Sequence, residues 1–212
     1  MKTRIILVRH GETEWNLQGR IQGRLDSPLT EAGRRQAEAI ANRLQPSSPQ
    51  AIASSDLGRC MQTASIIART IPRDVIPMKE FREKGGGIFE GYSWPEIERH
   101  FPAEYRRYRE HAPGYTQPGA ESWSDATARG LSGLDSVVRR YAGKRIVIVT
   151  HGGVLHAMIR NVLGIPDGAP SRIHFRNGAL HTLVHEESGY SVETIGDMCH
   201  LDGETADDIE SK

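Results

Sequence analysis

Two histidines follow apolar stretches of the chain in the same way. His10 comes directly after RIILVR, and His151 comes directly after RIVIVT. A glycine follows each histidine, where it allows the backbone to turn and to approach a bound group closely. A neutral imidazole can attack phosphorus without first losing a proton, and it can also hydrogen-bond to an oxyanion. The repeated pattern therefore indicates a site that binds an anion and attacks it.

Two arginines extend this pattern. Arg9 precedes His10, and Arg59 follows the stretch 51–55 within the motif SSDLGRC. The planar guanidinium group can hold two phosphate oxygens at once. Taken alone, Arg59 is typical of a solvated surface side chain. Together with the first arginine and the two histidines, it would complete a pocket for a phosphoryl dianion.

The elements that must position these side chains are strands alternating with helices. Short apolar runs predict buried strands at residues 4–8, 51–55, 74–78 and 145–150. Helical spacing and caps predict helices from Thr30 to Pro46, over 58–71, from the Ser122–Asp125 capping box to about Tyr141, and over 151–164. This alternation predicts an α/β three-layer sandwich, with a mostly parallel central sheet flanked by helices.

The candidate side chains all follow predicted strands. In an open parallel sheet, ligands bind at the carboxyl ends of the strands. The sequence HGG at 151–153 also begins a predicted helix, where free N–H groups and the helix dipole favour an anion. We therefore expect one anion site at this edge of the sheet.

The remaining segments fit a single domain over residues 1–212. Residues 83–121 contain four prolines and two short helical patches, which indicates a cap inserted over the carboxyl ends of the strands. The stretches on either side of Ser188-Gly189 predict a closing hairpin. The acidic tail from about residue 201 is expected to fray.

Composition excludes several classes of protein. The chain has 27 basic and 27 acidic residues, so its formal net charge is zero, which argues against a broad nucleic-acid or membrane-binding surface. The two cysteines, Cys60 and Cys199, are too few for a disulfide framework. The start of the chain resembles neither a signal peptide nor a membrane span. We expect a cytoplasmic protein that binds a small molecule.

Five motifs make the resemblance to a known family specific. LVRHGETEWN, SSDLGRCMQTA, FREKGGGIFEG, PGAES and VTHGG occur in the order and spacing of the histidine phosphatase superfamily, in its phosphoglycerate-mutase-like branch. The resemblance covers residues 3–200 and implies phosphoryl transfer through a phosphohistidine, with no metal and no cofactor.

The resemblance also implies roles for individual residues. His10 matches the nucleophile, while Arg9, Arg59 and His151 match groups that hold the phosphoryl oxygens. Glu83 matches the general acid that protonates the leaving group and then activates water. The glycines that follow it leave Glu90 open as an alternative acid.

Four further positions match the substrate-binding side of the family. Asn16 matches a phosphate-contacting residue, and Gln22 and the N–H group of Gly23 match the substrate side. Gly152 would offer a backbone N–H group.

Three functions remain open at this level. The first is a phosphomonoester phosphatase of the broad-specificity type, acting on small phosphorylated metabolites. The second is a cofactor-dependent phosphoglycerate mutase, which must shelter its phosphohistidine from water. The third is a non-catalytic phosphate-binding regulatory module, which the presence of all the catalytic positions disfavours. The chain lacks the longer basic insertion of the mutases, which favours the phosphatase.

Two departures from the family pattern affect the substrate. Gly86 stands where the family often has a bulky residue, and Phe89 replaces the usual tryptophan. The final motif GDMCHL resembles the tails of broad-specificity phosphatases and of metal-independent phosphoserine phosphatases. The identity of the leaving group is therefore left open.

Overall fold

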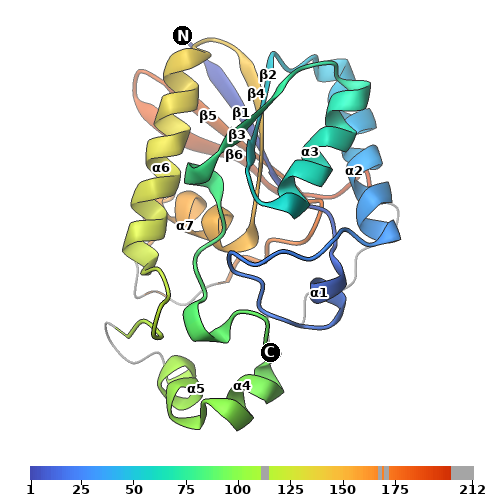
Figure 1. Ribbon diagram of the computed structural model, residues 1–212. Coiled ribbons are helices and arrows are strands. Elements are labelled where there is room, and N and C mark those ends of the chain that lie inside the picture. Colours follow the sequence, from blue (N-terminus) through green and yellow to red (C-terminus); the bar gives the residue numbers. More distant parts are fainter. Residues whose placement is uncertain (111–114, 167–168, 170–171, 202–212) are drawn as a thin grey trace.

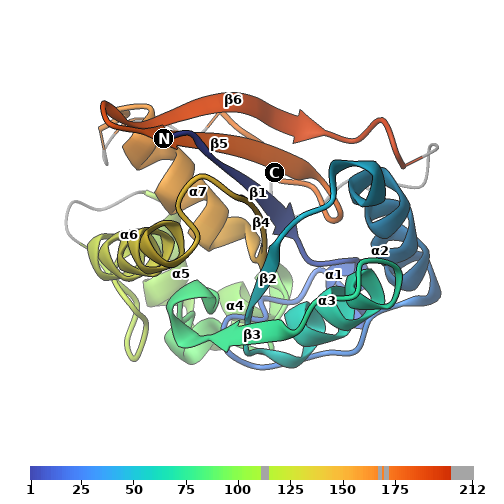
Figure 2. The ribbon, with the colours of Figure 1, turned by 90° about the horizontal axis from the view of Figure 1, so that it is seen from above.

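A six-stranded sheet lies at the centre of the computed structural model, which describes residues 1–110, 115–166, 169 and 172–201. The strands are β1 (Thr3–Arg9), β2 (Ala51–Ser55), β3 (Val75–Met78), β4 (Arg145–Thr150), β5 (Leu180–Glu186) and β6 (Gly189–Asp197). Figure 1 labels these strands, and their order across the sheet, β3-β2-β4-β1-β5-β6, can be followed from above in Figure 2. The first four strands pair in parallel, whereas β5 is antiparallel to both β1 and β6. The predicted mostly parallel sheet and closing hairpin are confirmed.

Helices cover both faces of this sheet. They are α1 (Glu14–Leu17), α2 (Glu31–Leu44), α3 (Gly58–Thr70), α4 (Trp94–His100), α5 (Pro102–Arg109), α6 (Trp123–Arg140) and α7 (Gly152–Val162). Seen from above, α2 and α3 lie on one side of the strands, and α6 and α7 lie on the other (Figure 2). The three-layer sandwich predicted from the sequence is therefore confirmed.

Successive side chains of β1 pack into two different core clusters, one on each face of the sheet. Ile5 and Leu7 pack in the cluster that includes α6 and α7, whereas Ile6 and Val8 pack in the cluster that includes α2 and α3. Successive side chains of a strand point to opposite faces, so a strand between two helical layers must be apolar throughout.

The predicted helix caps form. The side chain of Thr30 accepts a hydrogen bond from the Gly33 N–H group, and that of Ser122 accepts one from the Asp125 N–H group. Each bond satisfies a donor that has no partner inside the first turn of its helix. These local signals fix the starts of α2 and α6.

Gly11 serves backbone packing at the end of β1. A Cβ atom placed on Gly11 would lie 2.3 Å from the Gly33 carbonyl oxygen, and one on Gly33 would lie 2.0 Å from the Glu12 carbonyl oxygen. Gly11 therefore allows the loop after β1 to pack against α2, while its approach to a ligand stays a prediction.

The segment 83–121 carries α4 and α5, which correspond to the two helical patches predicted there. Both helices lie beyond the carboxyl ends of the parallel strands (Figure 1). Phe89 is fully buried, and its ring lies within 6.3 Å of Trp94 and Phe101 and 5.9 Å from Tyr108, measured between centroids. These aromatic contacts give the cap a small apolar core of its own.

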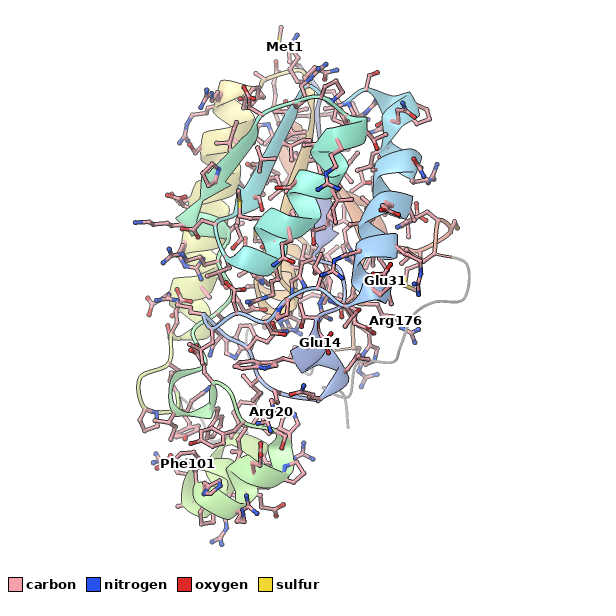
Figure 3. The ribbon with its side chains drawn as sticks, turned by 45° about the vertical axis from the view of Figure 1, so that its right-hand side comes forward. Met1, Glu14, Arg20, Glu31, Phe101 and Arg176 are labelled. Carbon is pink, nitrogen blue, oxygen red and sulfur yellow. The ribbon has the colours of Figure 1, made fainter. Side chains whose placement is uncertain are left out.

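Arg20 fastens the cap to the amino-terminal loop. It lies close to the two cap helices in Figure 3 and makes a two-point ion pair with Glu96 of α4, at 2.7 and 3.1 Å. Residues 202–212, where the frayed tail is predicted, lie outside the described residues. No helix in the described ranges has both the length and the apolar character needed to cross a bilayer.

The lowered pKa of the buried His181 ring makes the stability of the fold depend on pH. Burial, aided by the positive charge of Arg9, lowers the pKa of His181 from 6.5 to about 4 in the folded protein. The unfolded chain then binds more protons below pH 6.5, so stability falls as the pH drops from 6.5 toward 4. We expect this one side chain to make the free energy of unfolding about 2 kcal/mol smaller at pH 5 than at neutral pH.

Urea unfolding at pH 7.5 and pH 5 measures this effect. In the unaltered protein, the Gly196 N–H group donates to the His181 ring at Nδ1, at 3.1 Å. His181→Asn keeps an acceptor for this N–H group but removes the titrating ring. This variant should lose less stability between the two pH values than the unaltered protein. The matched control is His185→Asn on the same strand. Equal losses in the His181 variant and the unaltered protein would contradict the prediction.

Candidate active site

His10 lies immediately after β1 and is only 2% exposed. Its Nδ1 atom is 2.8 Å from the Gly11 carbonyl oxygen, and its Nε2 atom accepts from Arg59 Nε at 3.3 Å. A carbonyl oxygen only accepts and a guanidinium only donates, so this network assigns the proton to Nδ1. The lone pair is therefore on Nε2, the nitrogen available for attack.

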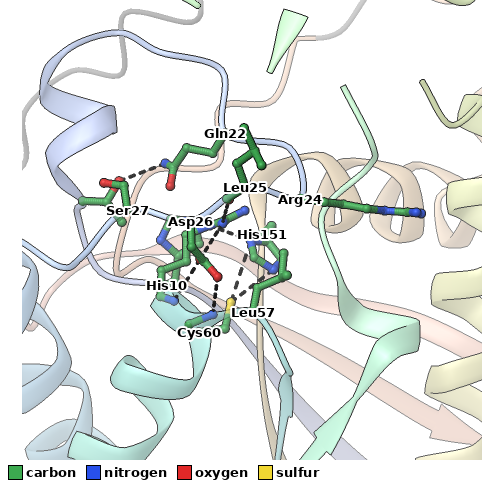
Figure 4. Close-up of polar contacts among 12 residues, drawn as sticks. His10, Gln22, Arg24, Leu25, Asp26, Ser27, Leu57, Cys60 and His151 are labelled. Atoms are coloured by element: carbon green, nitrogen blue, oxygen red, sulfur yellow. Dashed lines mark hydrogen bonds and ion pairs between the residues drawn. The ribbon is translucent and has the colours of Figure 1, made fainter. Parts of the chain in front are cut away.

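Arg59 connects the centre of the site to the loop over it. It lies in the first turn of α3, as predicted, and is 1% exposed. Its Nε atom is 3.3 Å from His10 Nε2 and 3.1 Å from His151 Nδ1. Its terminal nitrogens donate to the loop 23–26, including Asp26 Oδ1 at 2.9 Å. Figure 4 shows Leu25 and Asp26 of this loop close to His10 and His151. The guanidinium group of Arg59 is therefore held by the two imidazoles on one side and by the loop 23–26 on the other.

His151 follows β4 and is fully buried. Its ring centroid lies 5.2 Å from that of His10, and the two rings meet edge to face. Its Nε2 atom is 2.8 Å from Ser55 Oγ and 3.3 Å from Cys60 Sγ. These two side chains orient the ring so that Nδ1 points toward Arg59.

The electrostatic environment keeps both imidazoles neutral. Burial, reinforced by the positive charges of Arg59 and Arg9, lowers the pKa of His10 well below its ordinary value. Burial and the same positive neighbours also lower the pKa of His151. Burial raises the pKa of the Cys60 thiol, so this side chain stays protonated and is not a competing nucleophile.

Arg9 places a second positive charge at the same edge. It is the last residue of β1, is 5% exposed, and donates to the Phe175 carbonyl oxygen. A Cβ atom on Gly152 would lie 3.4 Å from the Arg9 Cζ atom. The predicted Gly152 therefore lies beside the guanidinium group, at the start of α7.

The carboxyl group of Glu83 lies at the amino terminus of α7. Its Oε2 atom accepts from the Gly153 N–H group at 3.2 Å, and its Oε1 atom accepts from the Lys84 N–H group at 2.8 Å. A Cβ atom on Gly153 would lie 2.5 Å from Glu83 Oε1. The second glycine of the HGG motif thus makes room for the predicted acid.

Asn16 and Gln22 both bond to Thr13, and neither side chain hydrogen-bonds to the imidazole of His10. Asn16 Oδ1 accepts from the Thr13 N–H and hydroxyl groups at 3.1 and 2.9 Å, and Gln22 Nε2 donates to the Thr13 hydroxyl at 2.9 Å. Gly23 adopts φ +52°, and its carbonyl oxygen accepts from Arg59 at 2.8 Å. Their roles toward a substrate stay predictions.

Two residues that sequence reasoning missed support the site. Asn177 Nδ2 donates to the His10 carbonyl oxygen at 2.9 Å and lies 3.4 Å from Asn16 Oδ1. Asp26 accepts from the Gly58 N–H group at 2.6 Å, which caps α3, and also bonds to Arg59. The Asn-Gly pair at 177–178 is a turn signal, but no local pattern identifies the partners of either side chain.

The geometry as a whole offers a neutral nucleophilic nitrogen between two buried arginines, a second imidazole, and a carboxylate at a helix terminus. Such an arrangement can bind a phosphoryl dianion and accept it on nitrogen. Among the described residues, no group of three or more His, Cys, Asp or Glu side chains could hold a metal ion.

Comparisons with known proteins agree on the family. The profile described as "Histidine phosphatase superfamily (branch 1)" matches residues 5–198. The chain is 35% identical over 211 residues to the "Probable phosphoglycerate mutase GpmB" of Photorhabdus laumondii, covering 97% of this chain and 98% of that protein.

Two solved structures are similar over almost their whole length. One is Bacillus stearothermophilus YhfR, with a TM-score of 0.83, 30% identity, and coverage of 93% of this chain and 98% of that one. The other is Entamoeba histolytica phosphoserine phosphatase in complex with 3-phosphoglyceric acid, with a TM-score of 0.83, 27% identity, and coverage of 94% and 99%. On its profile match and on its likeness to GpmB, the chain belongs to the histidine phosphatase superfamily.

Proposed function

We propose that this protein is a phosphomonoester phosphatase that hydrolyses small phosphorylated metabolites through a phosphohistidine at His10. The observation that carries the proposal is the neutral Nε2 atom of His10, which faces the Nε atom of Arg59 at 3.3 Å. An unprotonated nitrogen beside a buried cation is suited to attack a dianionic phosphate.

In the first step, His10 Nε2 attacks phosphorus and the bond from phosphorus to the leaving oxygen breaks. Arg9, Arg59 and His151 stabilise the negative charge on the phosphoryl oxygens. Glu83 gives its proton to the leaving oxygen. In the second step, the Glu83 carboxylate takes a proton from water, which attacks the phosphohistidine and releases inorganic phosphate and free His10.

The alternative is a phosphoglycerate mutase, which the names of similar curated proteins favour. Both reactions share the first step and differ in what accepts the phosphoryl group. A mutase returns it to glycerate, whereas a phosphatase gives it to water. The names of similar solved structures favour the phosphatase, since a phosphoserine phosphatase matches this chain over 99% of its own length with 27% identity.

A panel of phosphate monoesters distinguishes the two functions. Free phosphate and isomerised phosphoglycerate are measured separately, with and without 2,3-bisphosphoglycerate. We expect phosphate release from several esters and little isomerisation. Isomerisation that outpaces phosphate release would contradict the phosphatase and support the mutase. A similar protein of solved structure is named a phosphoserine phosphatase, so phosphoserine is included in the panel.

A further inference from the structure

Lys84 directly follows the candidate acid Glu83, and its ammonium group lies over an aromatic ring. Its Nζ atom is 5.1 Å from the centroid of the Trp123 ring. Trp123 begins α6 and is 45% exposed, which is unusual for a side chain of this size. The ring of His156, on α7, lies 5.4 Å from that of Trp123. We call Lys84, Trp123 and His156 the lysine-tryptophan patch.

Contacts connect this patch to both ends of the proposed reaction centre. The His156 ring lies 6.1 Å from that of Phe175, whose carbonyl oxygen accepts from Arg9. At the other end, the backbone N–H group of Lys84 donates to the Glu83 carboxylate at 2.8 Å. The patch is therefore connected by contacts to the neighbourhood of Arg9 at one end and to the candidate acid at the other.

Nearby carboxylates have other partners. Glu121 is bound at two points by Arg129, at 2.8 and 2.7 Å. Glu90 Oε1 accepts from the Gly86 and Arg24 N–H groups at 2.7 and 3.0 Å.

Within the described part of the chain, Lys84 Nζ forms no salt bridge, and its side-chain contact is the Trp123 ring. Burial lowers the pKa of this ammonium group, while Glu83, Glu121 and Glu90 raise it. A partly desolvated ammonium group is stabilised when a bound ligand brings an anion within hydrogen-bond distance of it.

We propose that the lysine-tryptophan patch is a leaving-group subsite, and that Lys84 selects substrates whose leaving group carries a carboxylate. Trp123 holds the lysine stem and covers the carbon skeleton of the leaving group. Burial lowers the pKa of His156 to about 4, so this ring contributes no second charge near pH 7. The inference rests on the proposed phosphatase function and names its substrate class.

One pair of substrates isolates the carboxylate. D-3-Phosphoglycerate and D-glycerol 3-phosphate have the same configuration at carbon 2 and differ only in a carboxylate that replaces a hydroxymethyl group. Phosphoryl transfer is counted as free phosphate plus any 2-phosphoglycerate, and kcat/KM is compared. The unaltered protein should prefer 3-phosphoglycerate by about 10- to 100-fold.

Lys84→Met should remove this preference. It should lower kcat/KM for 3-phosphoglycerate by about 10- to 100-fold and change it for glycerol 3-phosphate by less than about 3-fold. Lys84→Arg should restore part of the preference, because a cation remains. The matched control is Lys144→Met, since Lys144 is exposed and precedes β4, away from the carboxyl ends of the strands.

The outcomes separate this inference from the function on which it rests. If no ester of the panel releases phosphate, the phosphatase function itself fails. If other esters of the panel release it but neither of this pair does, the subsite is overturned while the phosphatase function stands. If both release it at similar rates, or if Lys84→Met slows both equally, the subsite is overturned while the phosphatase function stands. A circular dichroism melt of each variant distinguishes loss of fold from loss of selectivity.

Discussion

His10→Ala is expected to abolish phosphoenzyme formation and to lower turnover by at least about 10⁴-fold. The variant removes the Nε2 atom that faces Arg59. The neighbouring thiol of Cys60 is held protonated by burial. Rapid quench into alkaline detergent with a ³²P-labelled ester measures the adduct, which should be stable to base and labile to acid, as a phosphoramidate is.

The control for this variant is His185→Ala. His185 pairs with Thr3 at the opposite end of β1, so it shares the residue type but not the site. This variant should form the adduct at the normal rate. A base-stable adduct in His10→Ala, or an acid-stable adduct on a serine in the unaltered protein, would show that His10 is not the nucleophile.

Glu83→Gln is expected to slow phosphoryl transfer from an alkyl phosphate by about 10²- to 10⁴-fold. Glutamine keeps a carbonyl oxygen for the Gly153 N–H group, so the start of α7 is preserved, but it has no acidic proton to give. p-Nitrophenolate leaves without protonation, so the loss should be much smaller with p-nitrophenyl phosphate. Single-turnover quench experiments separate phosphoenzyme formation from its hydrolysis, which should also be slow.

Glu90→Gln is the matched control for the acid. The Glu90 carboxylate bonds to two backbone N–H groups and lies against Gly23, so its bonds connect the cap to the loop over Arg59. We expect this variant to show no dependence on the leaving group. If the dependence appears in Glu90→Gln and not in Glu83→Gln, the alternative acid left open by the sequence is the correct one.

The sequence predicts the main site because strand ends converge. His10 and His151 each follow an apolar run, and a parallel sheet brings the ends of such runs to one edge. The helix starts at Thr30 and Ser122 were likewise predictable, since each cap is a bond between residues three apart. Local sequence patterns are therefore enough to predict these strand ends and helix starts.

The supporting side chains were not predictable in the same way. Asp26 and Asn177 act on Arg59 and His10, which are distant in sequence, and nothing in their own neighbourhoods identifies those partners. The helix α1 is too short to show a periodic pattern. Gly11 was interpreted from its neighbour His10, whereas its environment is the backbone of Gly33, which only the packing of α2 brings near.

The order of strands in the sheet has a consequence for how the protein folds during synthesis. β1 is made first, yet its two neighbours are β4 and β5, from the last third of the chain. β2 can pair with β3 early, but β4 must join them before the centre of the sheet exists. Pairings between such distant segments are slow to form because the intervening chain must be ordered first. The amino-terminal strand therefore stays unpaired until β4 has left the ribosome, and its apolar side chains lack their partners in the sheet during that interval.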